Sequence, residues 1–515
     1  YHDPAIFAWE AEEIFRHEWR CVGREEETPN VGSYRLLEFA GEQVIISRGE
    51  DNVLHAFINA CRHRGATLIE GPLDGKPDCG EAKKIVCPYH AWVYAPDGSL
   101  LKAKHTDDLK RFDPADYALT KVRCETWQGF VFLTLDPNAE PLLDYLDDLV
   151  EIFGRFDFAP LRRTAREVYD VAANWKILVE NYSECYHCPG VHPQLNALTP
   201  YDLGEDIPAR GWWKGGWQPL VGEALTMGLD KGSHERPWLK GMTETDAKRI
   251  QYFAVWPNLL LSLHPDYLMV HMIEPIAPGR SRIVCDWYLH PDTMKMSGYD
   301  FSDAHGFWDM TNRQDWHVCE LQQRGTASKM LEPGRYSELE ASVQAFDLMV
   351  ADRYAADGEV SEYRDLVRQG VTVIATDTPL AVRSVLGAEV AMQVCPRLGL
   401  SAAETETVAW LVRHHLAMSA TAFQRDLMDP KTIQSFAELV QSPERLRLLL
   451  VLTVCDIRAV GPNVWNGWKA ALLRQLYHAA EQVLSGGTLS GGRAERIKAI
   501  QAEVGKRLMT WSEAE

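Results

Sequence analysis

Two histidines in the segment that runs from Glu180 to His192, ENYSECYHCPGVH, have a spacing that suits a metal ion. His187 and His192 are five residues apart, with Cys-Pro-Gly-Val between them. On a short helix that unwinds at the Pro-Gly step, both imidazoles can point at one ion. Two neutral imidazoles and one distant carboxylate form the facial triad that binds non-haem Fe(II) and leaves positions open for O2 and substrate. Because a His-x4-His pair also arises by chance, surface or core histidines are the competing interpretation of the pair alone.

Two loops further upstream, in CRHRGATL and CPYHAWVY, each supply one cysteine and one histidine. A structural zinc site also uses two thiolates and two imidazoles, but a zinc finger usually takes both cysteines from one element. The two loops resemble those of the Rieske [2Fe-2S] domain. That resemblance assigns Cys61 and Cys87 to one iron, and His63 and His90 to the other. Cys79, which lies between the loops, is interpreted as incidental to a solvated insertion, with an alternative ligand as the other interpretation.

The composition is that of a globular protein with more than one domain. The chain has 515 residues, of which 46% are hydrophobic and 24% charged. The net charge of -20 argues against nucleic acid or an anionic membrane as the main partner. No signal peptide is recognised, and no apolar run reaches the roughly 18 residues of a membrane span. Eleven cysteines without an export signal favour reduced thiols, so we expect a cytoplasmic protein.

The chain changes its apolar period several times. Residues 3–20 have helical spacing and predict an amphipathic helix. From Gly32 onward, short alternating runs broken by Gly and Asp predict β-hairpins, and FVFLTLD after Gly129 predicts another strand. The run PLLDYLDDLVEIFGRF then predicts a helical segment that leads out of the β-rich region.

Taken together, the Rieske loops, Asn-Trp-Lys, Glu-Asn-Tyr and His-x4-His resemble the catalytic α subunits of Rieske non-haem iron oxygenases, over roughly residues 1–354. The resemblance implies that His187, His192 and Asp315 bind the mononuclear iron. Asp309 and Glu320 are the alternative carboxylates. It also implies a small β-rich Rieske domain and a helix-grip-like α+β catalytic domain.

Glu184, three residues before His187, matches an acidic residue that bridges two metal centres in this family. The resemblance implies that it orients a metal-bound histidine and carries electrons from the Rieske cluster of a neighbouring subunit, in a homotrimer. The ECYHC form is similar to the branch that acts on quaternary ammonium compounds such as glycine betaine, choline, carnitine and stachydrine. The segment is one residue shorter than ENFxxDxYH, so no iron-proximal role is assigned to Asn181.

The resemblance further implies the reaction. A flavin/iron–sulfur reductase or a ferredoxin passes electrons from NAD(P)H, and O2 hydroxylates a C–H bond of a small molecule, with N-demethylation of a betaine-like compound as the expected outcome. Hydroxylation of an aromatic ring is the alternative. A quaternary ammonium group is held well by aromatic faces. The predicted cage residues, whose alternative interpretation is ordinary core packing, are Trp212, Trp213, Trp217 and Tyr267.

The last part of the chain resembles the later half of the HD domain of the bifunctional PII uridylyltransferase/uridylyl-removing enzyme, over roughly residues 384–510. Asp456, His414 and His415 are present. The segment has no His-Asp dipeptide, and Arg383 stands where the resembling sequences have histidine. An incomplete ligand set cannot assemble two-metal hydrolysis, so we expect an inert helical appendage, with a nitrogen-signalling fragment as the alternative.

These inferences predict an α+β protein whose last segment is all-α. The predicted divisions are an N-terminal helix at 1–30, the Rieske domain at 31–135, the iron-binding catalytic domain at 136–356, a linker at 357–383 and the partial HD-like segment at 384–515.

Overall fold

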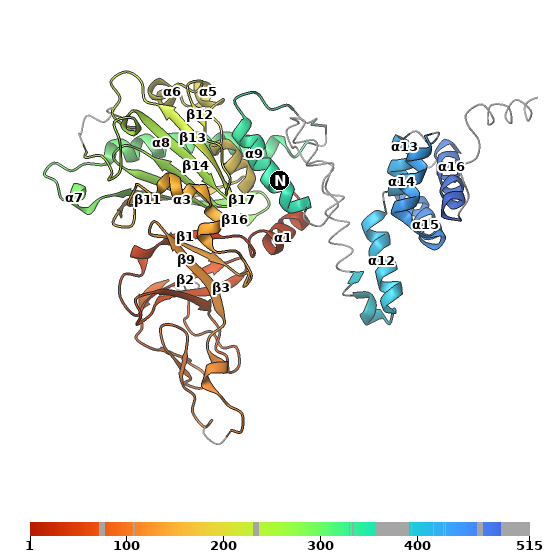
Figure 1. Cartoon of the computed structure of the whole chain (residues 1–515), viewed down its shortest axis with the longest axis horizontal. Coiled ribbons are helices and arrows are strands. Elements are labelled where there is room, and N and C mark those ends of the chain that lie inside the picture. The colour runs from red at the N-terminus through yellow and green to blue at the C-terminus, as the bar shows by residue number, and fades with distance from the viewer. Residues whose placement is uncertain are drawn as a thin grey trace, which may run out of the picture. The chain divides into compact units, whose positions relative to one another are not determined.

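The chain divides into two compact units, Tyr1–Thr378 and Pro379–Glu515, and each is described by itself (Figure 1). The predicted linker at 357–383 and Arg383 lie outside the described residues. The computed structural model describes residues 1–71, 78–106, 109–229, 236–328, 330–331, 334–355, 391–392, 394–415, 417–425, 427, 429–460 and 467–485.

The N-terminal helix is shorter than the sequence predicts, because α1 comprises only Pro4–Glu13. Its first turn is capped by Asp3, whose carboxylate accepts a hydrogen bond from the backbone of Ala5. The apolar side chains of Ile14 and Trp19 are almost completely buried in turns after the helix. Tertiary burial therefore overrides the helical spacing of residues 14–20, and Arg20–Arg24 forms strand β1.

The β-rich region forms a seven-stranded sheet in the order β1-β10-β9-β4-β3-β2-β5, and a separate three-stranded sheet carries β6, β7 and β8. The predicted hairpins are present, and the β2–β3 turn is made by Ala40 and Gly41, both with positive φ, as tight two-residue turns require. The strands after β1 are β2 Ser33–Phe39, β3 Glu42–Arg48, β4 Leu54–Ile58, β5 Cys79–Glu81, β6 Ile85–Val86, β7 Val93–Tyr94, β8 Leu100–Lys102, β9 Lys121–Trp127 and β10 Phe130–Thr134.

The second large sheet is antiparallel throughout and has the order β11-β17-β16-β15-β14-β13-β12. Its strands are β11 Arg162–Val171, β12 Glu205–Asp206, β13 Trp213–Pro219, β14 Arg249–Val255, β15 Leu259–Leu263, β16 Leu268–Ala277 and β17 Arg280–Leu289. The helices of this region are α2 Leu142–Leu146, α3 Asp148–Phe153, α4 Trp175–Tyr182, α5 Cys188–Val191, α6 Pro193–Leu198, α7 Pro291–Met294, α8 Ser302–Gly325 and α9 Ala341–Ala355. Helices α4, α8 and α9 pack on this sheet (Figure 1), so the α+β class predicted for the first unit is confirmed.

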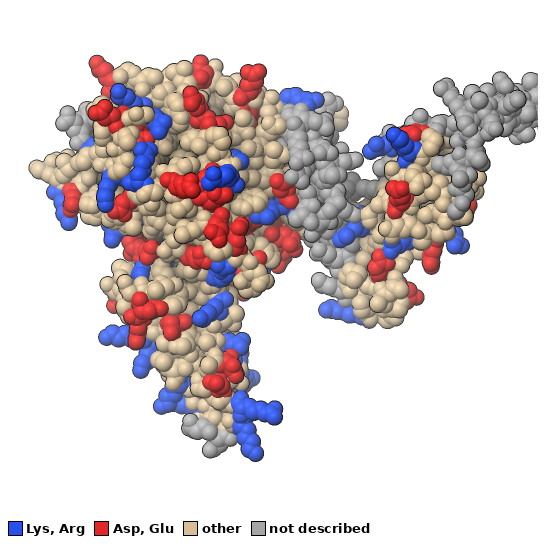
Figure 2. Space-filling model, viewed as in Figure 1, with Lys and Arg blue, Asp and Glu red and all other residues tan. Residues whose placement is uncertain are grey.

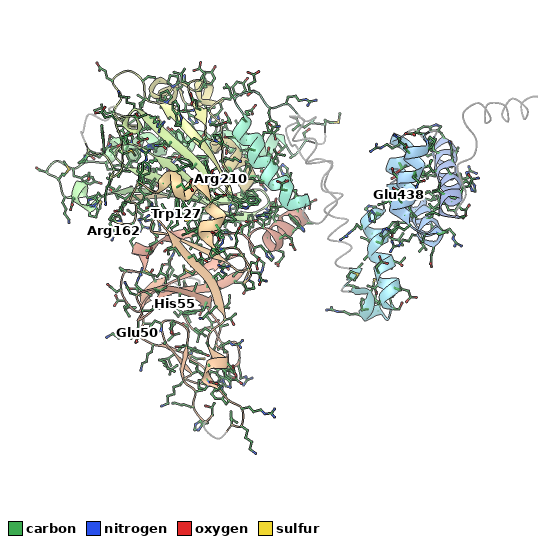
Figure 3. The ribbon with its side chains drawn as sticks, viewed as in Figure 1. Glu50, His55, Trp127, Arg162, Arg210 and Glu438 are labelled. Atoms are coloured by element: carbon green, nitrogen blue, oxygen red, sulfur yellow. The ribbon has the colours of Figure 1, made fainter. Side chains whose placement is uncertain are left out.

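The two large sheets are tied together by a buried asparagine. Asn258, which is 4% exposed, accepts a hydrogen bond from the backbone N–H of Cys21 and donates one to the carbonyl of the same residue, both at 2.9 Å. It thereby satisfies both backbone groups of one residue in β1. At the surface, Arg162 of β11, which is labelled in Figure 3, forms an ion pair of 3.5 Å with Glu26.

Replacing Asn258 by alanine should lower the free energy of unfolding by roughly 2–4 kcal/mol, because two buried backbone groups lose their partner. Urea denaturation followed by tryptophan fluorescence measures the change. Asn138→Ala, at an exposed turn, is the matched control and should stay within about 0.5 kcal/mol of the parent. Equal stability of the two variants would contradict the role given to Asn258.

The described part of the second unit is helical, which confirms the all-α prediction for these residues. The helices are α12 Ala402–His414, α13 Ala417–Gln424, α14 Pro430–Val440, α15 Pro443–Val460 and α16 Gly467–Leu484. Helix α12 begins with a capping box formed by Ser401 and Glu404. The core is made by buried aliphatic side chains that include Leu446, Leu449 and Leu476.

Within the described residues, no helix has both the length and the apolar character that crossing a membrane requires. Figure 2 shows acidic and basic side chains interspersed over the visible face rather than separated into two fields.

Candidate active site

His187, His192 and Asp315 converge on one point. The Nε2 atoms of His187 and His192 lie 3.3 and 2.8 Å from Oδ1 of Asp315. One ligand atom from each of the three residues lies within 4.8 Å of the other two. The histidines flank α5 and the aspartate comes from the middle of α8, so the fold brings together residues more than 120 positions apart. Two imidazoles and one carboxylate are the donor set of a facial triad, and their convergence fits a mononuclear iron.

The chain path between α4 and α5 differs from the predicted one. Helix α4 ends at Tyr182, where the hydroxyl of Ser183 donates a hydrogen bond to the carbonyl of Val179. The break therefore lies before His187, and Pro189 stands in the first turn of α5 rather than at a point of unwinding. Proline suits this position because the first turn of a helix needs no N–H donor there.

Each histidine is oriented through its other ring nitrogen. Oε1 of Glu184 lies 2.6 Å from Nδ1 of His187, and Oε1 of Gln314 lies 2.8 Å from Nδ1 of His192. Each acceptor binds the Nδ1–H of its histidine, so the Nε2 atoms of both histidines face Asp315. Metal-ligating histidines are commonly oriented in this way. Sequence reasoning identified Glu184 but missed Gln314, although its place beside Asp315 on α8 was a usable signal.

The electrostatics of the three residues reflect their mutual contacts. Burial lowers the pKa of His187, but hydrogen bonds to Asp315 and Glu184 outweigh it and raise that pKa to about 10. Burial raises the pKa of Asp315, but hydrogen bonds from both histidines outweigh it and lower that pKa below its usual value. The site thus stabilises a carboxylate between two imidazoles. A metal cation is attracted by the same negative charge, and it displaces protons from the imidazoles as it binds.

The two alternative carboxylates are engaged elsewhere. Asp309 accepts hydrogen bonds from the hydroxyl of Tyr169 and the guanidinium of Arg313, at 2.9 and 3.0 Å. Glu320 accepts a hydrogen bond of 3.1 Å from the backbone of Ala172. Asp309 is six residues from Asp315 on α8, about a turn and a half, so the two carboxylates lie on different helical faces.

The two cysteine–histidine loops have matching backbones. In each loop, the fourth residue after the cysteine donates its N–H to the cysteine carbonyl and has positive φ, which is 74° at Gly65 and 54° at Ala91. Cys61 and Cys87 are each 2% exposed, and burial together with the neighbouring Cys87 raises the pKa of the Cys61 thiol. The loops therefore present two sheltered sulfurs at one place.

The histidines of these loops are exposed, in contrast to the cysteines. The rings of His63 and His90 have centroids 4.6 Å apart, and His63 stacks on Trp92. Two adjacent thiols and two adjacent imidazoles, paired by type, fit a [2Fe-2S] cluster with one iron on each side. Cys79 is exposed in β5, where it pairs with Arg35 of β2. None of the eleven cysteines forms a disulfide bond in the structure.

A cavity of about 220 Å³ opens beside the histidines and Asp315. Its polar lining includes Asn181, to which no role was assigned from the sequence, and His271. Burial lowers the pKa of His271 to about 4, so that imidazole is neutral at neutral pH. Its aromatic lining includes Tyr182, Tyr201, Tyr252, Trp308 and Trp316.

Three of the four predicted cage residues do not line this cavity. Trp213 is fully buried and donates its indole N–H to Asp148, and Trp212 stacks on Tyr145. Tyr267 is also fully buried, with its hydroxyl bonded to the carbonyl of Met227. The rings of Trp213 and Tyr267 are core material, which was the alternative interpretation, and that of Trp212 is partly buried against Tyr145.

Trp217 borders the cavity, but its ring points elsewhere. The β13–β14 register pairs Trp217 with Gln251 and Gly216 with Tyr252, so the ring of Trp217 lies on the sheet face opposite to that of Tyr252. The Arg249 guanidinium lies 5.3 Å from its centroid. The sequence could not separate these faces because the strand boundaries and register of β13 were not known.

Two family models match the chain. Residues 18–113 match the Rieske [2Fe-2S] domain, and residues 158–356 match the ring hydroxylating alpha subunit (catalytic domain). The glycine betaine monooxygenase oxygenase subunit of Chromohalobacter salexigens is 30% identical over 365 residues, which cover 65% of this chain and 80% of that protein. The carnitine monooxygenase oxygenase subunit of Acinetobacter pittii is 38% identical over 334 residues, which cover 64% and 84%. This chain belongs to the Rieske oxygenase family.

Solved structures agree with this assignment. A quaternary ammonium Rieske monooxygenase, described in terms of carnitine oxidation and inter-subunit electron transfer, matches the oxygenase with a TM-score of 0.54 at 26% identity. The match covers 68% of this chain and 94% of that one. Naphthalene 1,2-dioxygenase from Rhodococcus sp. shares the fold, with a TM-score of 0.50 at 22% identity over 67% of this chain and 91% of that one. As a member of the family, the oxygenase carries a Rieske [2Fe-2S] cluster and a mononuclear non-haem iron, and it is an oxidoreductase that uses O2.

The C-terminal part of the oxygenase has a different origin. It is 69% identical over 122 residues to the bifunctional uridylyltransferase/uridylyl-removing enzyme of Novosphingobium aromaticivorans, which is 24% of this chain but only 13% of that enzyme. Of the histidines considered there, His414 packs on Trp410, and Nδ1 of His415 contacts the carbonyl of Val412 at 2.9 Å. The resemblance to part of that enzyme is confirmed.

Replacing Asp315 by alanine should remove the mononuclear iron from the oxygenase, because the triad loses its only carboxylate. Iron content should fall from about three to about two per chain, with the EPR signal of the reduced Rieske cluster retained. Asp309→Ala, on the same helix, is the matched control and should retain about three irons. Full iron occupancy in the Asp315 variant would show that another carboxylate binds the metal.

Proposed function

We propose that the oxygenase hydroxylates an N-methyl group of a betaine-type quaternary ammonium compound, so that the compound is demethylated. The observation that supports this most is the lining of the cavity beside the triad. Aromatic rings surround the space, and the exposed carboxylates of Glu205, Asp206 and Glu338 border it. Aromatic faces attract a cation that cannot donate hydrogen bonds, and nearby carboxylates add to that attraction.

The stoichiometry follows from the chemistry of the N-methyl group. The N–CH3 group, O2, two electrons and two protons give N–CH2OH and water. The N–CH2OH group then breaks its C–N bond, which releases formaldehyde, the demethylated amine and a proton. The names of the glycine betaine and carnitine monooxygenase relatives favour this substrate class, whereas the naphthalene dioxygenase bears on the fold alone.

The residues around the triad have distinct parts in this reaction. When bound, the mononuclear iron activates O2 and the Rieske cluster supplies electrons singly. His187, His192 and Asp315 would hold the iron, while Glu184 and Gln314 keep the Nε2 atoms directed at it. The rings of Tyr252, Trp308 and Trp316 would hold the substrate cation and exclude water from the reacting methyl group.

We further propose that Glu184 carries electrons between subunits of a homotrimer. Its carboxylate contacts His187 on one side, and the histidines of the Rieske loops are exposed and available to a neighbouring copy. A flavin/iron–sulfur reductase or a ferredoxin would supply these electrons from NAD(P)H. Free cysteines and this source of electrons favour a cytoplasmic location.

For the second unit, we propose a helical appendage without phosphohydrolase activity. The proposal is supported by the missing His-Asp pair and by the small share of the uridylyltransferase relatives that the oxygenase covers. A nitrogen-signalling role remains the second candidate, favoured by the 69% identity over this segment.

Formaldehyde release should accompany O2 consumption when the iron-loaded oxygenase and a reductase are supplied with glycine betaine, carnitine or choline. Naphthalene should give neither a diol nor O2 uptake above background. The measurement is formaldehyde formed per O2 consumed, with the Asp315→Ala variant as the blank. A diol from naphthalene without formaldehyde from any ammonium compound would favour the aromatic-ring alternative.

Replacing Glu184 by glutamine should slow steady-state turnover by about tenfold or more, since partners that orient metal ligands typically matter by 10–100-fold. Iron content and the EPR signal of the reduced cluster should be unchanged, while the reduced cluster should be reoxidised more slowly after substrate and O2 are added. Glu223→Gln, at an exposed carboxylate, is the control. Reoxidation at the parent rate would argue against an electron path through Glu184.

A further inference from the structure

We propose that Lys214 binds the carboxylate of the substrate, so that the cavity selects zwitterionic quaternary ammonium compounds over simple cations. This inference rests on the proposed function and specifies the substrate class within it. A site for both charges would make betaines, rather than quaternary ammonium alcohols, the preferred substrates.

Strand register places Lys214 on the cavity side of the second sheet. Lys214 pairs with Ala254 in β14, Ala254 pairs with Leu260 in β15, and Leu260 pairs with His271 in β16. Directly paired residues share a face, so Lys214 and His271 point to the same side. Both line the cavity, as does Ala254 between them.

The ammonium of Lys214 has no partner in the described part of the chain. Neither a hydrogen bond nor an ion pair joins it to any described residue, although the side chain is only partly exposed. Burial lowers its pKa, while the charges of Asp148 and Asp206 act in the opposite direction from beyond ion-pair distance. Asp148 and Asp206 accept hydrogen bonds from other residues, so the N–H donors of Lys214 stay available to a ligand.

Two sheltered cations of the same unit, Lys176 and Arg236, are paired with carboxylates, whereas Lys214 is not. Lys176 bonds Glu10, and Arg236 lies between Asp266 and Asp303. A partly desolvated ammonium without a partner is costly in a structural role, but it suits an anion that arrives with a ligand.

The distribution of charge along the wall matches a zwitterion. Lys214 is the only lysine or arginine among the described residues that line the cavity, whereas acids and aromatic rings are numerous there. Its backbone is three strands from that of His271, or roughly 14 Å at about 4.8 Å per strand. Lys214 lines the cavity at one end of that span. A short betaine therefore has room to place an N-methyl group toward the triad and its carboxylate toward Lys214.

Two substrates that differ only in the carboxylate test the inference without any mutation. Glycine betaine and its methyl ester carry the same trimethylammonium group, and formaldehyde release gives KM and kcat for each with the full-length, iron-loaded oxygenase. The ester should have a KM at least about tenfold higher at similar kcat, because it loses a charge-assisted hydrogen bond. Equal KM values for acid and ester would overturn the role of the carboxylate.

The variant Lys214→Met keeps the length of the side chain and removes the ammonium. It should raise KM for glycine betaine by about tenfold or more, leave KM for choline within about threefold, and abolish the difference between acid and ester. Lys214→Arg should restore part of the preference. Lys248→Met, at an exposed lysine outside the cavity, is the control and should behave as the parent.

The outcomes separate this inference from the function on which it rests. If no ammonium compound yields formaldehyde, the proposed function fails. If formaldehyde is released but Lys214→Met changes KM for choline and glycine betaine equally, the oxygenase function stands and Lys214 only balances Asp206. If Lys214→Met does not fold, the comparison of acid and ester with the parent protein still decides whether the carboxylate is recognised.

Discussion

The active site depends on one carboxylate that two imidazoles share. Asp315 lies within 3.3 Å of Nε2 of both His187 and His192, and those residues flank a helix of only four residues. So short a helix cannot hold its own ends in place, because most helical stability comes from tertiary packing. The 24-residue helix α8 supplies that support, since it carries both Asp315 and Gln314. Anchoring α8 to the sheet therefore anchors the metal site.

A second constraint is that charged side chains removed from water need partners of opposite charge. Several cations of the catalytic region are neutralised by buried carboxylates, as Asp286 neutralises Arg166 and Asp246 neutralises Arg155. Such pairing leaves few charges free to respond to a ligand. Some polar groups that line the cavity have no partner among the described residues, including the side-chain oxygen of Gln218 and the indole N–H of Trp316. Recognition and folding thus draw on different sets of polar groups.

The sequence predicted those features that depend on residue type and local spacing. The Rieske loops, the histidines of the triad and Asp315 belong to short motifs, and the structure places each set together. Features that depend on long-range packing were not predictable. The helix at 3–20 was overestimated because Ile14 and Trp19 owe their burial to other segments. The aromatic cage was assigned to Trp213, which the structure buries in the core, because a tryptophan-rich run does not reveal which side of a strand faces the cavity.

The two sides of the Rieske loops differ in accessibility: the sulfurs of Cys61 and Cys87 are covered, and the rings of His63 and His90 are open to solvent. The imidazole edge is therefore the side of the cysteine–histidine loops that a partner can approach. The exposed rings of His63 and His90 can contact one neighbouring protein at a time. In a ring of copies where each edge docks against the next subunit, an electron donor must either wait for that contact to open or bind a different face of the domain.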